Sequence, residues 1–184
     1  HMTLSSSRRS VFGVPAGKLL GFIVCNRGIE ANPAKIRALS QLATPTDLKQ
    51  VQKLAGCVTA LSRFISRLGE KSLPLYRLLR RTDNFEWIDA ATAGLEEIKT
   101  LLASNPILAA PNAGEPMLLY ISATHQVVSA MLVVEREQDE HKFPLQKPVY
   151  YVPTVLTPCK SRYPHYQNIA YAVSMASRKL RHYF

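Results

Sequence analysis

The sequence predicts an α+β protein built from two lobes, in which a β-hairpin and a helical region precede a small sheet and a final helix. Two observations predict this class. Short apolar runs rich in β-branched residues occur near the start of the chain and again after residue 116, whereas other segments repeat apolar residues at helical spacing. Residues 106–116 contain three prolines and Gly114, which marks a linker. The predicted lobes are therefore residues 11–105 and 106–184.

Length and composition limit the function classes. At 184 residues and 47% hydrophobic content the chain can bury a core, and no apolar run reaches the ~18 residues that span a bilayer. We therefore expect an intracellular protein without membrane association, in which residues 1–10 are a tag and a disordered start. Cys25, Cys57 and Cys159 lie far apart without ligand-spaced partners, so neither a disulfide framework nor a metal site is predicted, and no cofactor is expected.

The net charge of +10 is concentrated in the first part of the chain. The first 82 residues contain 14 lysines and arginines against three acidic residues, whereas the rest of the chain contains nine against ten. The basicity therefore belongs to the first half of the chain.

The first lobe begins with a predicted hairpin. Ser10–Val14 and Lys18–Cys25 are its strands, and Pro15-Ala-Gly17 supplies its turn. Two short helices are predicted near the end of the lobe, over Pro74–Arg81 and over Ala90–Ser104. Asp89 would cap the second of these helices and Asn105-Pro106 would end it.

Between these elements, a long helix is predicted from the cap Thr44-Pro-Thr-Asp47 to about Leu68. At 100° per residue its apolar residues keep to one side. Four basic residues fall within about 80° of one another on the opposite side: Lys49, Lys53, Arg63 and Arg67. Such a stripe fits the phosphate backbone of a nucleic acid, and a solvated charged face is the alternative of equal weight.

The second lobe is predicted to hold three strands and a helix. Met117–Thr124 and Gln126–Val134 form a hairpin, and a third strand covers about Pro148–Val155 after a charged loop. Thr157-Pro158 would start the helix. Its inward face is predicted to contain Tyr166, Ile169, Ala170, Val173, Ala176, Ser177, Leu180 and Phe184.

Several runs in this lobe resemble the ribonuclease H (RNase H) domain of gypsy-type LTR retrotransposon polyproteins: Leu119–Thr124, Val128–Leu132, Val149–Tyr151 and Arg178–Phe184. The resemblance implies a truncated RNase H-like lobe and covers nearly all of residues 11–184. It implies that the first hairpin is the reverse transcriptase segment where the palm passes into the thumb. Leu20-Gly21-Phe22 would then form the primer grip, Lys18 of the same hairpin would also contact nucleic acid, and the helices after them would form the thumb.

The resemblance also locates the family's catalytic residues. Ser122 occupies the position of an RNase H aspartate and Ile169 that of a glutamate, while Gln167 lies where a second acid often occurs. RNase H cleavage resembles two-metal hydrolysis, in which carboxylates hold Mg²⁺. The family's polymerase motif, Tyr-x-Asp-Asp, is absent from the sequence. We therefore expect neither activity, as in the inactivated RNase H copy of plant Tat-type elements, which connects polymerase and nuclease.

Three function hypotheses remain. The first is a noncatalytic protein-interaction or structural module, derived from a retrotransposon and taken into a host gene. Its partner would be another protein or a second copy of the chain, bound at an exposed edge strand, 117–122, through Leu119 and Ile121. The second is sequence-independent binding of a nucleic-acid duplex through the basic helix and the primer grip. Residual RNase H activity is the third.

Overall fold

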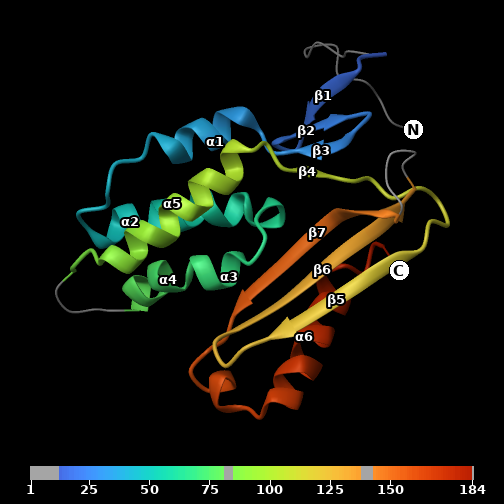
Figure 1. Cartoon of the computed structure of the whole chain (residues 1–184). Coiled ribbons are helices and arrows are strands. Elements are labelled where there is room, and N and C mark those ends of the chain that lie inside the picture. Colours follow the sequence, from blue (N-terminus) through green and yellow to red (C-terminus); the bar gives the residue numbers. More distant parts are fainter. Residues whose placement is uncertain (1–12, 81–84, 138–142, 184) are drawn as a thin grey trace, which may run out of the picture.

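The computed structural model describes residues 13–80, 85–137 and 143–183. Figure 1 shows two lobes: a small sheet beside a group of helices, and a three-stranded sheet whose far face is covered by the last helix. The α+β class and the division into a helical lobe and a sheet lobe are therefore confirmed. None of the described helices is long and apolar enough to cross a membrane.

The small sheet has four antiparallel strands in the order β1-β2-β3-β4 rather than the predicted hairpin. Its turn lies at Leu20-Gly21, where both residues have positive φ (48° and 84°), as a two-residue hairpin turn requires. The predicted turn at Pro15–Gly17 is therefore wrong, and the predicted strand at residues 10–14 lies partly outside the described residues. The four strands are β1 (Ala16–Leu19), β2 (Phe22–Cys25), β3 (Gly28–Glu30) and β4 (Ile107–Leu108).

Strand β4 comes from the predicted linker and pairs with β3. A Cβ atom at Gly28 would lie 2.1 Å from the carbonyl oxygen of Leu108, so glycine is what allows the two backbones to approach. The linker therefore begins as part of the first lobe.

The helices of the first lobe differ most from the prediction after Ala60. Asp47 caps the second helix as expected, since its side chain accepts a hydrogen bond from the Gln50 amide at 2.8 Å. The predicted helix to Leu68 is wrong, because residues 62–71 form two short turns that pack against the second lobe. Asp89 is the first residue of its helix, and Ile88 takes the cap position. The helices are α1 (Pro33–Ser40), α2 (Leu48–Ala60), η1 (Ser62–Phe64), α3 (Leu68–Lys71), α4 (Leu73–Arg80) and α5 (Asp89–Ala103).

The second lobe contains the three predicted strands in the order β5-β6-β7, all antiparallel. The third strand begins at Leu145, earlier than predicted. Thr157-Pro158 do not start the last helix, which begins at His165 after a short turn, η2 (Lys160–Arg162). The other elements are β5 (Met117–Ala123), β6 (Val127–Arg136), β7 (Leu145–Val155) and α6 (His165–Lys179).

Helix α6 packs on β5 and β6 with a face that is rotated from the predicted one. Ala176 and Leu180 are buried as expected, whereas Tyr166 and Val173 are 70% and 46% exposed. The buried residues Asn168, Ala172, Ala176 and Leu180 repeat every four positions. The predicted face was wrong for Tyr166 and Val173, because the close approach of helix and sheet places the small side chains of Ala172 and Ala176 against the strands.

The two lobes pack against each other through β7 and the turn at α3. Gly69 of α3 lies so close to β6 that a Cβ atom there would be 2.3 Å from Cγ1 of Val127. Tyr151 of β7 packs against the core of the first lobe, and the Ala109 amide donates to the Pro148 carbonyl at 2.8 Å. β5 consequently forms the other edge of the sheet, and no described strand pairs with its outer side.

Candidate functional site

The three positions that the resemblance assigns to RNase H acids do not share one face of the second lobe. Ile121 packs under α6, so the next residue on the strand, Ser122, points to the opposite face of the sheet. There it lines a hollow of about 340 Å³ together with residues 65–67 of the first lobe. Gln167 is exposed on α6 and Ile169 is half-buried on the same helix. In the described part of the chain, no group of three or more His, Cys, Asp or Glu residues could hold a metal ion.

Arg63, predicted as a phosphate contact, instead joins the two lobes. Its guanidinium carbon lies 4.5 Å from the ring centre of Phe22 on β2 and 4.8 Å from that of Tyr150 on β7. One of its nitrogens also donates to the Tyr150 hydroxyl at 3.4 Å. Because the side chain is held between two aromatic rings, it is removed from the predicted basic stripe.

The same aromatic group extends on both sides of Arg63. Phe22 meets Phe64 with a centroid distance of 5.8 Å, and Tyr150 meets Tyr183 at 6.4 Å. Burial raises the pKa of the Tyr183 hydroxyl, and the nearby Arg63 charge partly opposes that shift. One cluster of aromatic side chains around Arg63 therefore joins the hairpin, the helical region, β7 and residue 183.

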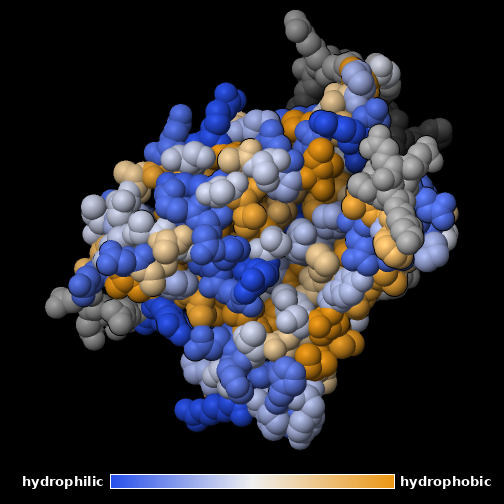
Figure 2. Space-filling model, in the orientation of Figure 1, coloured by the Kyte–Doolittle hydropathy of each residue, from blue (hydrophilic) through white to orange (hydrophobic). Residues whose placement is uncertain are grey.

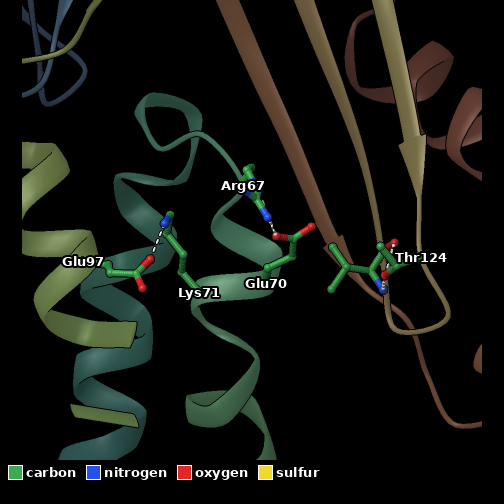
Figure 3. A network of polar contacts seen from close by, with 6 residues as sticks. Arg67, Glu70, Lys71, Glu97 and Thr124 are labelled. Carbon is green, nitrogen blue, oxygen red and sulfur yellow. Dashed lines mark hydrogen bonds and ion pairs between the residues drawn. The ribbon is translucent and has the colours of Figure 1, made fainter. Parts of the chain in front are cut away.

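Arg67 is also withdrawn from the stripe. Its backbone is left-handed (φ 54°), and its Nε and Nη2 atoms donate to Glu70 at 2.9 and 2.5 Å. Figure 3 shows α3 between α5 and the sheet, with Lys71 reaching Glu97 on the other side. The hydrogen bond from Lys71 lowers the pKa of Glu97. These cations are neutralised locally by acids of the same lobe.

Lys49 and Lys53 remain exposed on α2, and the structure adds Lys35 of α1 to them. Lys35 and Lys53 line a shallow hollow of about 290 Å³ between the two helices. The floor of this hollow is made of small residues: Ala38, Gly56, Cys57 and Ala60. Within the described residues these three lysines form no ion pair. We name them the thumb surface.

The predicted primer-grip residues lie next to this surface. Leu20 is 89% exposed at the tip of the β1–β2 turn, and Lys18 is exposed on β1. Lys35 Nζ lies 5.2 Å from the ring centre of Phe22. A Cβ atom at Gly21 would lie 3.0 Å from the same Lys35 Nζ. Sequence reasoning missed Lys35, although Asn32-Pro33 is a helix-start signal that could have located α1.

The predicted partner-binding strand is exposed at its edge. Leu118, Leu119 and Tyr120 are 39%, 37% and 44% exposed, whereas Ile121 packs into the core under α6. Figure 2 shows hydrophobic side chains along the right-hand side of the molecule, where β5 runs in Figure 1. Leu119 is therefore accessible, and Ile121 is largely taken up by the lobe's own core.

Comparison with known proteins agrees with this architecture. Residues 87–184 match the family described as the RNase H-like domain found in reverse transcriptase. The chain therefore belongs to that family. The helical lobe and the RNase H-like lobe together correspond to the reverse transcriptase region of a retrotransposon or retroviral polyprotein.

The similar proteins are much longer than this chain. The Retrovirus-related Pol polyprotein from transposon opus of Drosophila melanogaster is 25% identical over 177 residues, which cover 90% of this chain and 17% of that protein. The Transposon Tf2-3 polyprotein of Schizosaccharomyces pombe is 24% identical over 166 residues, or 90% of this chain and 12% of that protein. The chain thus spans less than a fifth of either relative.

Two solved structures show the same fold. The foamy viral protease-reverse transcriptase in complex with an RNA/DNA hybrid matches with a TM-score of 0.70 and 19% identity, over 90% of this chain and 22% of that one. The same viral protein in complex with dsDNA matches with a TM-score of 0.71 and 20% identity, over 90% of this chain and 33% of that one.

Proposed function

We propose that this chain is a noncatalytic structural module of a retroelement polyprotein, in which the RNase H-like lobe supports the thumb-like lobe. The observation that carries the proposal is the position of Arg63 between Phe22 and Tyr150. This contact joins the β1–β2 hairpin to a strand that is more than 120 residues later in the sequence. A lobe that stabilises its neighbour through such a contact needs no catalytic activity for that role.

The side chains at the acid positions support a noncatalytic role. Neither the Ser122 hydroxyl nor the Ile169 side chain offers the carboxylate that two-metal hydrolysis requires. Ser122 also points away from α6, the helix that carries Gln167 and Ile169. This arrangement is consistent with an inherited inactive copy of the kind found in plant Tat-type elements, which a host gene could retain for binding alone.

Catalytic silence is tested with a labelled RNA/DNA hybrid. We expect no product above the metal-free control when purified chain is incubated with Mg²⁺ or Mn²⁺. Metal-dependent cleavage that coelutes with the chain and disappears in Ser122→Ala would overturn the noncatalytic role.

The supporting role is tested by hydrogen exchange after a change in the second lobe alone. In Tyr150→Leu, the amides of β1 and β2 should exchange about fivefold faster, since a contact worth about 1 kcal/mol is lost. Tyr166→Leu makes the same change at a side chain that is 70% exposed and serves as the matched control. Unchanged exchange in the hairpin of Tyr150→Leu would show that the lobes do not support each other.

The exposed strand β5 would give this module its partner, and we propose a second copy of the chain. Met117–Ala123 carries no charged residue or proline that would discourage pairing. Two β5 edges can pair antiparallel around a two-fold axis, because such an interface uses the same strand from each copy.

A second candidate function is sequence-independent binding of a nucleic-acid duplex. The thumb surface favours it. Its three lysines have no ion pair in the described residues, and two of them, Lys35 and Lys53, line a hollow whose small side chains let a sugar-phosphate backbone approach. Three neutralised phosphates give a salt slope of about −2.7, at about −0.9 each.

Duplex binding is measured across a salt series with the three lysines replaced by alanine. The substitutions at Lys35, Lys49 and Lys53 should lower affinity and remove most of the slope, whatever the duplex sequence. The same change at Lys99, Lys147 and Lys160 is the control for total charge. Equal losses of duplex affinity in both triple variants would show that binding depends on total charge and not on the thumb surface.

A further inference from the structure

A hollow of about 350 Å³ lies where the two lobes meet, along residues 153–155 of β7. The first lobe contributes Thr59, Tyr76 and Arg80 to its lining, and the second lobe contributes Thr154 and Lys179. The hollow beside Ser122 borders it on the other side of Pro153, the one residue that lines both, and none of the residues around the hollow of the thumb surface lines it. Its volume lies at the lower end of the range of small-molecule sites, about 300–1,000 Å³.

The polar groups of this hollow are incompletely satisfied. The Thr154 hydroxyl is buried and has no hydrogen-bond partner, although a buried polar group normally has one. The Thr59 and Tyr76 hydroxyls face each other at 3.4 Å, which is long for a hydrogen bond between two oxygens. The residues that line the hollow therefore include three with hydroxyl groups, and that of Thr154 has no partner within the described residues.

The charged groups of the hollow are both positive. Arg80 makes one long hydrogen bond, 3.4 Å from Nη2 to the Leu156 carbonyl oxygen, and Lys179 has no ion pair among the residues that the structure describes. No described aspartate or glutamate lines the hollow. Two cations from opposite lobes, without a carboxylate between them, favour a bound anion.

We propose that this inter-lobe hollow binds a phosphate monoester. A phosphoryl group has three acceptor oxygens, which match the hydroxyl donors, and its charge is complementary to Arg80 and Lys179. The volume leaves room for a small organic group on the ester oxygen. Because the two cations come from different lobes, the bound ester also stabilises the contact between them.

Binding is tested on the full chain with adenosine monophosphate and inorganic phosphate, followed by ³¹P chemical shift and by calorimetry at constant ionic strength. We expect saturable binding of the monophosphate and at least a tenfold loss of affinity in Thr154→Val and in Lys179→Gln. Arg178→Gln, at the neighbouring exposed position on α6, is the matched control and should bind as the parent does. Thr154→Val removes an unpaired buried hydroxyl without changing side-chain shape, so this variant should fold.

The source of the ester is distinguished by two oligonucleotides that differ only in a 5′-phosphate or a 5′-hydroxyl. A preference for the 5′-phosphate that Thr154→Val abolishes identifies a nucleic-acid end as the ligand. Saturable monophosphate binding without that preference identifies a free ester. The proposal is overturned if no probe binds saturably, or if Arg178→Gln loses as much affinity as Lys179→Gln.

Discussion

Arg63 contacts two aromatic rings from distant parts of the sequence, and this position determines what its removal should cost. Each cation–π contact is worth about 0.5–2 kcal/mol, depending on burial, and Arg63 is half-buried. We expect Arg63→Ala to lower the free energy of unfolding by about 1–3 kcal/mol, measured by urea denaturation.

The control for Arg63 is an exposed arginine on a helix. Arg37→Ala on α1 should change the free energy of unfolding by less than about 0.5 kcal/mol. Equal losses in the two variants would show that the ring contacts contribute nothing measurable. Arg63→Lys should fall between them, since lysine keeps the charge without the flat guanidinium.

Two helical glycines have opposite surroundings and should respond in opposite directions to alanine. In Gly69→Ala the new methyl group would lie 2.3 Å from Val127 Cγ1, so the lobes must shift, at a cost of about 1–3 kcal/mol. Gly56→Ala meets nothing within 4 Å and should gain about 0.5–1 kcal/mol from helix propensity. Thermal unfolding of both variants tests the pair, and a stabilised Gly69→Ala would contradict the close contact between lobes.

At the scale of elements, an ion pair connects the segment before β5 to the end of β6. Arg136 donates to Glu115 at 2.8 Å and to the Ala110 carbonyl at 2.7 Å, and the Asn112 amide donates to Glu115 at 2.7 Å. The Arg136 hydrogen bond, followed by that of Asn112, lowers the pKa of Glu115 from 4.5 to about 2. Arg136 thereby fixes the linker at Ala110 and Glu115 to β6 of the three-stranded sheet.

The lowered pKa gives this contact a defined pH window. A depressed folded-state pKa stabilises the protein above the ordinary value of 4.5, and that stabilisation is lost as the pH falls toward 2. Glu115→Gln should therefore be destabilised relative to the parent at pH 6 and should approach it at pH 3, in urea midpoints measured at both values. Glu86→Gln, at an exposed glutamate, should not show this convergence.

At the scale of the whole molecule, the free edge of β5 predicts self-association. The mass measured by sedimentation should rise with protein concentration. Leu119→Lys should keep the chain monomeric, because it places a charge beside the pairing strand. Leu145→Lys makes the same change on β7 at a residue of nearly equal exposure, 39% against 37%, and should leave the dimer intact. If the parent keeps the mass of a monomer at every concentration, the proposed dimer through β5 does not form.

Local sequence patterns were enough to predict most of the strands of the second lobe and the end of one helix. The β-branched runs gave β5, β6 and β7 in order, and Asn105-Pro106 marked the end of α5, since strand periodicity and proline geometry are local properties. The residue types at positions 122 and 169 supplied the expectation of a noncatalytic lobe. The strand and helix predictions depend on neighbours within a few residues, whereas positions 122 and 169 were located by the family resemblance.

The packing of the two lobes determines which of the predicted surfaces remain available. Arg63 and Arg67 continue the basic pattern of α2 in sequence, yet one lies between aromatic rings and the other pairs with Glu70. Helix α2 ends at Ala60 because the burial of η1 and α3 against β7 outweighs local helix propensity, which is worth less than about 1 kcal/mol per residue. Tyr150 lies 87 residues from Arg63, and no local pattern encodes a contact over that separation.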